Sequence, residues 1–395
     1  MKRTMMFGCL WLMGVCSIGW AVEVEVLPAS APLGQLTGLA DLNQYPPVCL
    51  EWKTLTVKEG LPNDHIYWVE TDKLRKDRVW LGTDNGVVCY GIADGSIEVI
   101  QPKDGLGHQA VMSVAVDHLT GDVWAATFGG LSWISGGKVR RNFDQFNSGL
   151  PNNVVYCVIT EGETVWTATT AGLGRYHYKT DEWEIFTSLN MPTDENWCYN
   201  LCQGGGRVYV AAWGGGIIEY TLETGRFQHY LDPDNEFEID LFPHDGLVHN
   251  ITTSPAFHDG LLWATTYFGM SVYNYRRWRG YFDHDSGLAS NFINYARAQP
   301  GTHNGWICTD KGLSVLNYDT NRWVTYTPID GHGPRGTVEL WEGGERQKVF
   351  ETESTIGHNF VLNVDFLDNT VWVGTSHGLS WAKLPQHISP VIQGE

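Results

Sequence analysis

Short apolar runs with an alternating pattern recur along most of this chain, and they occur in pairs separated by a turn of constant form. The stretch from Val371 to Trp381 shows the unit, because VWVGT is followed by two polar residues and then by GLSW. Alternation of apolar and polar residues predicts a β-strand with one buried face. A Gly after a two-residue turn supplies the positive φ that a tight hairpin needs. Each stretch is therefore predicted to be strand, turn, strand.

Seven stretches have this form, and each carries a Trp or Tyr at its second position. These markers are Trp80, Trp124, Trp166, Tyr209, Trp263, Trp306 and Trp372. Successive markers lie 44, 42, 43, 54, 43 and 66 residues apart, so two of the steps contain insertions. A period of about 43 residues with four short strands is typical of propeller blades, small sheets that bury their faces against each other. The sequence predicts an all-β fold, a single seven-bladed β-propeller over residues 49–384.

The last predicted blade is one strand short, because too few residues follow Trp381 to form its outer strand. The segment from Leu50 to Val57 has the outer-strand pattern but no blade of its own. We expect this N-terminal strand to complete the last blade and close the ring, which removes open sheet edges. Residues 22–48 are then predicted to be a surface leader, and residues 385–395 a C-terminal tail.

Residues 1–21 have the pattern of a signal peptide: Lys2 and Arg3, an apolar run, and small residues before a predicted cleavage site. We therefore expect export, to the periplasm or out of the cell. Cys16 suggests a lipoprotein, but Val15 before it does not suit lipidation. No other run approaches the roughly 18 apolar residues of a membrane span. A soluble exported protein without a membrane span is expected.

The formal net charge of −19 repels phosphate backbones, which excludes nucleic acid as a partner. An acidic surface suits cations, basic partners or neutral ligands such as sugars. Without a CxxCH or a paired CxxC, neither haem nor structural zinc is expected, and no cofactor is predicted. Disulfides are permitted in an exported chain, and their connectivity stays open. The cysteines concerned are Cys49, Cys89, Cys157, Cys198, Cys202 and Cys308.

One face of a propeller collects the turns between second and third strands and the links between blades. Most links have a form close to GLxxN, which places an amide or acid before each inner strand. Such side chains hydrogen-bond backbone in turns, so this structural interpretation comes before ligand contact. The residues are Asp64, Gln109, Asn153, Asn196, Asn250, Asn291 and Asn359.

Departures from the repeat on this face are better candidates for function, because the turns do not require them. Exposed aromatic rings beside Asn and His suit a sugar ring or a partner side chain; alternatively, the rings pack beneath the insertions. The aromatic candidates are Phe128, Trp197, Trp213, Tyr267 and Phe268, and the histidines are His108, His249, His358 and His377. No HxH or HExxH spacing supports a metal centre. An acid/base alternative combines His249, His358 or His377 with Asp245.

Both insertions are expected on this same face, where long loops on a rigid scaffold often serve recognition. Residues 231–244 alternate acidic residues, and Asp232, Asp234 and Glu236 are the calcium candidates. This loop lacks the mid-loop Gly and terminal Glu of an EF-hand, so a solvated lid is the other interpretation. Residues 328–356 are predicted to form a hairpin rising from the face, with Trp341 as a candidate contact.

The repeat WxGTxxGLxxY, followed by an aromatic outer strand and GLxxN, resembles the two-component regulator propeller repeat. The best copies are VWLGTDNGV, with Gly60-Leu61-Pro62-Asn63, and VWVGTSHGL, and the resemblance covers about Cys49 to Leu384. Sensor-type members of this family join such propellers to a membrane span and a kinase, and neither is found in this sequence. The resemblance implies a stand-alone propeller that recognises a ligand or protein outside the cytoplasm.

The sequence therefore predicts an exported binding or scaffold module that acts on the face carrying the insertions. Its partner is expected to be a protein in the envelope or outside the cell, a glycan, or a small ligand. The alternative is an extracytoplasmic lyase or hydrolase, since propellers with similar repeats include lyases with His and acidic residues at the mouth. That analogy is at the level of the fold alone.

Overall fold

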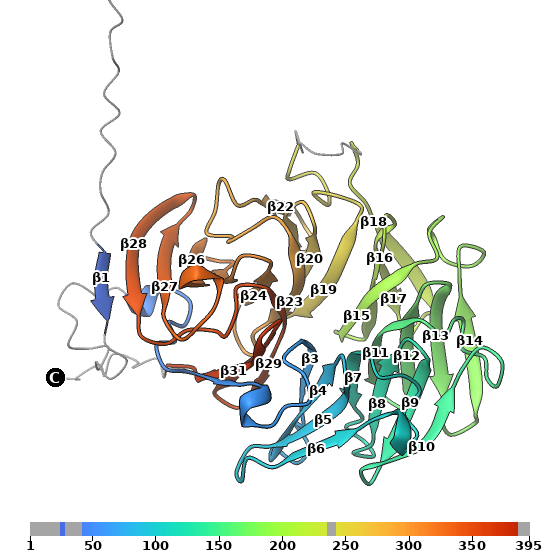
Figure 1. Cartoon of the computed structure of the whole chain (residues 1–395). Coiled ribbons are helices and arrows are strands. Elements are labelled where there is room, and N and C mark those ends of the chain that lie inside the picture. Colours follow the sequence, from blue (N-terminus) through green and yellow to red (C-terminus); the bar gives the residue numbers. More distant parts are fainter. Residues whose placement is uncertain (1–23, 28–41, 235–241, 386–395) are drawn as a thin grey trace, which may run out of the picture.

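The computed structural model describes residues 24–27, 42–234 and 242–385, and these form seven sheets arranged as blades in a ring (Figure 1). The all-β seven-bladed propeller predicted from the repeat is confirmed. Residues 1–21, predicted to be a signal peptide, lie outside the described residues, as do Glu236 and the chain after residue 385. No helix among the described residues is both long and apolar enough to cross a membrane.

The first three blades each contain four antiparallel strands, which follow one another from the central channel outward. Blade one is β3 (Ile66–Thr71), β4 (Arg78–Thr83), β5 (Gly86–Gly91) and β6 (Ile97–Ile100). Blade two is β7 (Val111–Val116), β8 (Val123–Thr127), β9 (Gly130–Ser135) and β10 (Lys138–Phe143). Blade three is β11 (Val155–Glu161), β12 (Thr164–Thr169), β13 (Gly172–His177) and β14 (Glu182–Phe186).

Blades four to seven repeat this order. Blade four is β15 (Cys198–Gly204), β16 (Arg207–Ala212), β17 (Gly216–Thr221) and β18 (Arg226–Tyr230). Blade five is β19 (Thr252–His258), β20 (Leu261–Thr266), β21 (Met270–Tyr273) and β22 (Trp278–Tyr281). Blade six begins with β23 (Ile293–Ala298), β24 (Asn304–Thr309), β25 (Leu313–Asn317) and β26 (Arg322–Pro328). Blade seven contains β29 (Val361–Leu367), β30 (Thr370–Thr375) and β31 (Gly378–Lys383).

The ring closes as predicted, because β2 (Trp52–Leu55) pairs antiparallel with β31 and becomes the outer strand of blade seven. Trp52 helps to fix this strand. Its backbone N–H donates to Ser354 Oγ at 2.9 Å, its indole N–H donates to the Cys49 carbonyl at 3.2 Å, and its ring lies edge-on to Tyr326 at 5.5 Å. The N-terminal strand therefore completes blade seven as a four-stranded sheet.

Residues of the repeat have a consistent role in every blade. All seven aromatic markers are at most 4% exposed, since they lie on second strands between neighbouring blades. The Gly after each turn has φ between 67° and 150°. The Thr before each turn donates its hydroxyl to that Gly carbonyl at 2.7 to 3.0 Å in six blades. In blade four Ala212 replaces this Thr, and the Thr252 hydroxyl donates to Gly216 O instead.

The insertion at residues 328–356 differs from its prediction. It does not rise from the face. Its strands β27 (Gly336–Glu342) and β28 (Glu345–Thr352) continue the sheet of blade six outward, and β1 (Val24–Leu27) pairs parallel with β28 (Figure 1). The outward path follows from the unpaired edge of β26, which offers backbone donors and acceptors to the next strand.

Residues 46–48, expected in a surface leader, are buried in the structure. The Tyr326 hydroxyl donates to Pro47 O at 2.7 Å and accepts from Cys49 N at 2.8 Å, so the segment before β2 is attached to blade six. The six cysteines from Cys49 to Cys308 are all free thiols, and only Cys202 is not fully buried.

Candidate functional site

Each inner strand carries a β-bulge at its second residue, close to the end where the strand enters the channel. In β3, for example, Ile66 pairs with Thr83 and Trp68 with Gly82, so Tyr67 has no partner of its own. The same shift occurs in the other six inner strands. A bulge redirects a side chain and is common next to functional sites. The bulged residues are Tyr67, Met112, Tyr156, Tyr199, Thr253, Asn294 and Leu362.

A continuous row of aromatic rings crosses the mouth from blade two to blade six, and we call it the aromatic arc. Its centroid distances are 5.9 Å from Phe128 to Tyr156, 5.1 Å from Tyr156 to Tyr199, and 5.4 Å from Tyr199 to Trp213. The row continues from Trp213 to Tyr267 at 5.3 Å and from Tyr267 to Phe292 at 3.9 Å, where the rings are nearly parallel. Trp197 stacks on Trp213 at 5.3 Å and completes the arc.

The arc brings together two kinds of position that are separate in the sequence. Phe128, Trp213 and Tyr267 are the first residues of second-to-third turns, which the preceding Thr or its substitute holds in place. Tyr156 and Tyr199 are bulge residues. Phe128 is 39% and Phe292 36% exposed, whereas the other members are partly buried. Neighbouring rings thus support each other and leave one side open to solvent.

Polar groups accompany the rings. The hydroxyls of Tyr199 and Tyr267 share a hydrogen bond, and burial raises the pKa of both phenols, so both are protonated at neutral pH. Trp197 Nε1 is buried and has no hydrogen-bond partner among the described residues. The arc therefore combines apolar ring surfaces with the hydroxyl groups of Tyr199 and Tyr267.

The rest of the mouth, at blades seven and one, is polar. Asp84 accepts from the Tyr67 hydroxyl at 2.9 Å, and its other oxygen lies 3.3 Å from His65 Nδ1. His65 also stacks on Tyr67 at 4.3 Å. Burial lowers the pKa of His65, although Asp84 opposes this, and burial raises the pKa of Tyr67 to about 12. Both groups are therefore mainly neutral at pH 7.

Five side chains of the predicted ring of amides and acids accept hydrogen bonds from the backbone. The Oδ1 atoms of Asn153, Asn250 and Asn291 accept backbone N–H groups from the end of the preceding blade at 2.8 to 2.9 Å. Their carbonyls accept from the turn glycines of that blade at 2.8 to 3.0 Å. Asp64 and Asn196 make the same side-chain contact at 2.7 Å, and the Asn359 backbone N–H donates to Gly331. These side-chain oxygens already accept backbone hydrogen bonds, so the ligand site proposed below does not depend on this ring. The five residues are Asp64, Asn153, Asn196, Asn250 and Asn291.

The predicted histidines are held in different ways. His249 is buried and stacks on Phe268 at 4.2 Å, and burial lowers its pKa. His358 Nδ1 lies 2.9 Å from Ser376 Oγ and accepts from Phe360 N, and burial lowers its pKa too. His377 lies 3.6 Å from Asp64.

His108 is exposed at the edge of the arc, 6.2 Å from Phe128. Asp245, the carboxylate of the acid/base alternative, is exposed as well. The His–carboxylate pairs that the structure describes at the mouth include His65 with Asp84 and His377 with Asp64. His358 lies near His377 and His332, whose charges help to lower its pKa after burial, whereas His249 is held against Phe268 in blade five.

Two predicted contacts lie away from the arc. Trp341 is in β27, opposite Trp323, and its indole N–H donates to Glu339 at 3.1 Å. At about 4.8 Å between neighbouring strands, β27 is roughly 19 Å from the inner strand of its blade. Of the calcium candidates, Asp232 is buried and Glu236 lies outside the described residues. No group of three potential metal ligands occurs in the described part of the chain.

The residues predicted from the sequence did not include Tyr156, Tyr199 and Phe292, nor His65 and Tyr67 on the polar side. A signal for them exists, because the same position of every inner strand holds the bulged residue. That position is not marked by a Gly, Pro or other turn residue, so only its recurrence in register across the blades identifies it.

No family model matches this chain, and no curated protein matches it. The fold resembles solved propellers. The extracellular domain of the putative hybrid two-component system BT3049 from B. thetaiotaomicron is 16% identical, with a TM-score of 0.63 over 85% of this chain and 42% of that chain. This chain thus spans less than half of that domain. The RRP9 WD40 repeats, at 9% identity, give a TM-score of 0.58 over 86% of this chain and 99% of that one. The computationally designed protein Ika8, at 13% identity, gives 0.52 over 86% and 100%.

These similarities show the fold alone, a propeller like that of a sensor extracellular domain. They agree with the repeat resemblance at the level of architecture.

Proposed function

We propose that this protein is an exported binding module of the sensor type, which recognises a neutral carbohydrate chain through the aromatic arc. The observation that carries the proposal is the arc itself, a row of seven rings from five neighbouring blades at the open mouth of the ring. The folding of a propeller does not require aromatic side chains there, since blades one, six and seven place Asp84, Asp310 and Ser376 at the equivalent turn position.

The rigidity of the arc favours binding. Each ring is packed on at least one other ring, and the turns and bulges that carry them are tied to the sheets by hydrogen bonds. A ligand that docks on such a surface loses its own freedom but does not have to order the protein. Ring-to-ring distances of 3.9 to 5.9 Å give one continuous aromatic surface, in which some neighbouring rings are stacked and others edge-to-face.

Charge and chemistry point to carbohydrate. The protein is strongly acidic, so an anionic polymer is disfavoured, whereas a neutral sugar carries no such cost. Sugar rings present an apolar face to an aromatic ring and hydroxyls at their edges. The hydroxyls of Tyr199 and Tyr267 supply polar groups for such hydroxyls within the arc. A protein partner that inserts aromatic or aliphatic side chains is the competing occupant.

The likeness to a sensor extracellular domain supports location and role only as a proposal. A propeller outside the cytoplasm that binds a glycan is suited to reporting it to a separate membrane complex. The acid/base alternative receives less support, because Asp245, the carboxylate named for it, is exposed.

The test is a binding screen of the purified protein on an array of neutral glycans, followed by calorimetry with the best ligand. The variants are Trp213→Ala, in the arc, and Trp341→Ala, a matched control in β27. We expect Trp213→Ala to weaken binding by about tenfold or more, by comparison with nucleic-acid bases, for which stacking on one aromatic side chain contributes about 1–3 kcal/mol. The control should bind as the parent does.

Equal losses in both variants would show that the arc is not the site. If no glycan binds, and an envelope protein is instead retained by the parent and lost with Trp213→Ala, the occupant is a protein and the carbohydrate proposal is wrong. New reducing ends in a glycan incubated with the protein would favour the enzymatic alternative.

A further inference from the structure

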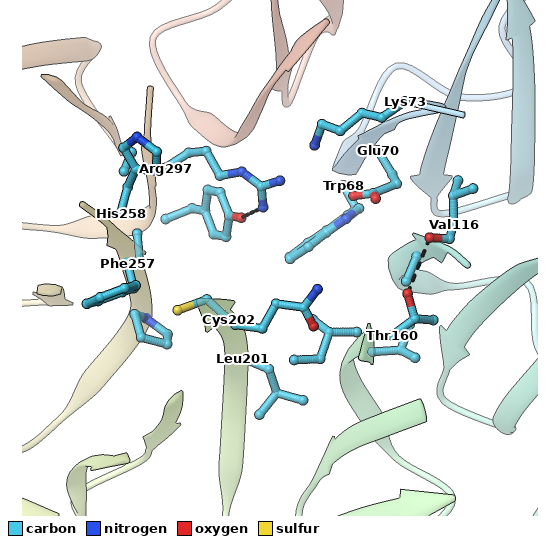
Figure 2. Close-up of a pocket in the computed structure, with 18 of the residues that line it drawn as sticks. Trp68, Glu70, Lys73, Val116, Thr160, Leu201, Cys202, Phe257, His258 and Arg297 are labelled. Carbon is cyan, nitrogen blue, oxygen red and sulfur yellow. Dashed lines mark hydrogen bonds between the residues drawn. The ribbon is translucent and has the colours of Figure 1, made fainter. Parts of the chain in front are cut away.

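A cavity of about 260 Å³ lies in the central channel toward the end of the ring opposite the aromatic arc. The C-terminal halves of the inner strands line it, together with residues from the turns that follow them. Along β3, Glu70 is three residues beyond the bulged Tyr67, which places the cavity about 10 Å further along the channel. Figure 2 shows Trp68, Glu70 and Arg297 directed toward its centre.

Two cations share one buried carboxylate at the wall of this cavity. Asp365, 1% exposed, lies 3.0 Å from Arg297 Nη2 and 3.2 Å from Lys73 Nζ. It also accepts from the backbone N–H and the hydroxyl of Thr71 at 2.9 and 2.6 Å. Lys73 and Arg297 together hold the pKa of Asp365 below its usual range, near 2, against the effect of burial. The guanidinium of Arg297 makes one further bond, to the Tyr295 hydroxyl at 3.3 Å, and has five N–H donors in all.

Glu70 is the second carboxyl of the cavity, and it has the opposite titration behaviour. Burial, and then the neighbouring Asp365, raise the pKa of Glu70 to about 7, although Lys73 and Arg297 oppose this. Near neutral pH much of Glu70 is therefore protonated. The cavity then carries one excess positive charge, from Lys73 and Arg297 against Asp365.

The other titratable groups around the channel are neutral or hydrogen-bonded. Burial and Lys73 lower the pKa of His118, and burial raises the pKa of the thiols and of Tyr295. His258 Nε2 accepts from Gly301 N at 2.9 Å. The groups facing Glu70 from the surrounding strands and turns are Lys73, His118, Cys157, Cys202, His258, Tyr295, Arg297 and Asp365.

Two polar atoms at the cavity have no hydrogen-bond partner among the described residues. Trp68 is 6% exposed, and its Nε1–H is buried and unpaired. Gln203 Oε1 is likewise buried and unpaired. An unpaired buried polar group is unfavourable, so each is a place where a bound molecule would restore a bond.

We propose that this cavity is a second ligand site, which binds a small organic acid. The carboxylate of the ligand pairs with the free donors of Arg297, and its other polar groups meet Trp68 Nε1–H and Gln203 Oε1. The site is distinct from the aromatic arc in place and in chemistry.

Size and charge select this class of ligand. At about 30 Å³ per molecule the cavity holds about eight waters, so a ligand of amino-acid size fits and a glycan chain does not. A planar carboxylate matches a guanidinium in two parallel bonds. The single excess positive charge balances a monocarboxylate, whereas a phosphate dianion would overcompensate it. Trp68, Phe257 and Tyr295 supply apolar walls for the body of the ligand.

Binding is expected to weaken as the pH rises. Below the pKa of Glu70 its carboxyl is neutral and can donate a hydrogen bond to the ligand. Above it, a second negative charge stands beside the ligand carboxylate and opposes binding. The affinity of the acid should therefore fall between about pH 6 and pH 8.

The experiment is calorimetric titration of the purified full chain with benzoate, phenylacetate and lactate, each beside its own amide, at pH 6 and pH 8. Inorganic phosphate serves as the non-carboxylate anion. We expect at least one acid to bind about tenfold or more tightly than its amide at pH 6, and less tightly at pH 8. Binding of the amides equal to that of the acids, binding of phosphate as tight as that of the acids, or no binding of any acid at pH 6 would each overturn the inference.

Variants locate the site. Arg297→Lys keeps the charge but loses the two-bond geometry, and should weaken the acid about tenfold. Gln203→Leu should weaken it less, while Gln109→Leu, on the exposed mouth, should leave it unchanged. Glu70→Gln should remove the pH dependence. Trp213→Ala should not affect the acid at all, so a loss there would place the acid at the mouth and refute the second site. A melting curve for each variant confirms that it is folded.

Discussion

The carboxyl of Glu70 should make the stability of this protein depend on pH, and the replacement Glu70→Gln should remove that dependence. In the folded protein the pKa of Glu70 is raised from 4.5 to about 7, mainly by burial and then by Asp365. Between those two values the folded state binds a proton that the unfolded state has released. The free energy of unfolding therefore falls as the pH rises through this window and is constant above it.

The size of the effect follows from the shift. Each pKa unit corresponds to about 1.4 kcal/mol, so the raised pKa lowers the stability by at most about 3 kcal/mol at pH 8. Glu70 borders the cavity, and water there would solvate its carboxylate and reduce this figure. Asp365 acts outside the window, because its pKa is lowered from 3.8 to about 2. Its contribution is nearly complete at pH 5 and is lost as the pH falls toward 2.

The assay is guanidinium unfolding of the parent and of Glu70→Gln from pH 4.5 to pH 8. The quantity of interest is the change in their stability difference across this range, since other titrating groups, such as His118, are common to both proteins. We expect the variant to gain up to about 3 kcal/mol on the parent as the pH rises. The exposed Glu223→Gln is the matched control and should show a constant difference. A constant difference for Glu70→Gln as well would refute a buried, proton-binding carboxyl in the channel.

Three further outcomes are expected. Trp52→Ala should destabilise the protein by about 3–5 kcal/mol in denaturant unfolding, because it leaves a cavity where the ring closes; a loss below 1 kcal/mol would mean that β2 contributes little. Thr266→Val should lower the free energy of unfolding by about 1–3 kcal/mol in the same assay, since the Phe268 N–H and the Gly269 carbonyl lose their hydrogen bonds to the Thr266 hydroxyl. Tyr199→Phe keeps its ring but loses the bond to Tyr267, so glycan affinity should fall a few-fold with little change in melting temperature; unchanged affinity would show that this hydroxyl pair does not contribute.

Much of the architecture could be predicted from the sequence because it is encoded locally and then repeated. A Thr, a two-residue turn and a Gly with positive φ fix one hairpin, and the recurring Trp at positions such as Trp166 fixes how blades stack. Even the closure by β2 was predictable, since the last blade lacked a strand and the N-terminus had one to spare. The face on which the turn aromatics such as Trp213 gather followed from the blade topology alone.

The tertiary structure decided which side chains meet. Whether Phe128 touches Tyr156 depends on a turn in blade two and a bulge in blade three, and neither is visible as a contact in a periodic pattern. The hairpin at residues 336–352 pairs with the outer edge of β26 and does not rise from the face. The unpaired backbone N–H and C=O groups of that edge offer hydrogen bonds to an added strand.

The channel shows most clearly that the sequence alone does not predict which side chains meet. Thr71 and Asp365 are 294 residues apart, and only closure of the ring brings Glu70, Arg297 and Asp365 together. Local sequence determines the strands and turns of this protein, since their energetics depend on near neighbours. Chemistry in its channel depends on charges from different blades, whose distances and burial exist only in the folded ring.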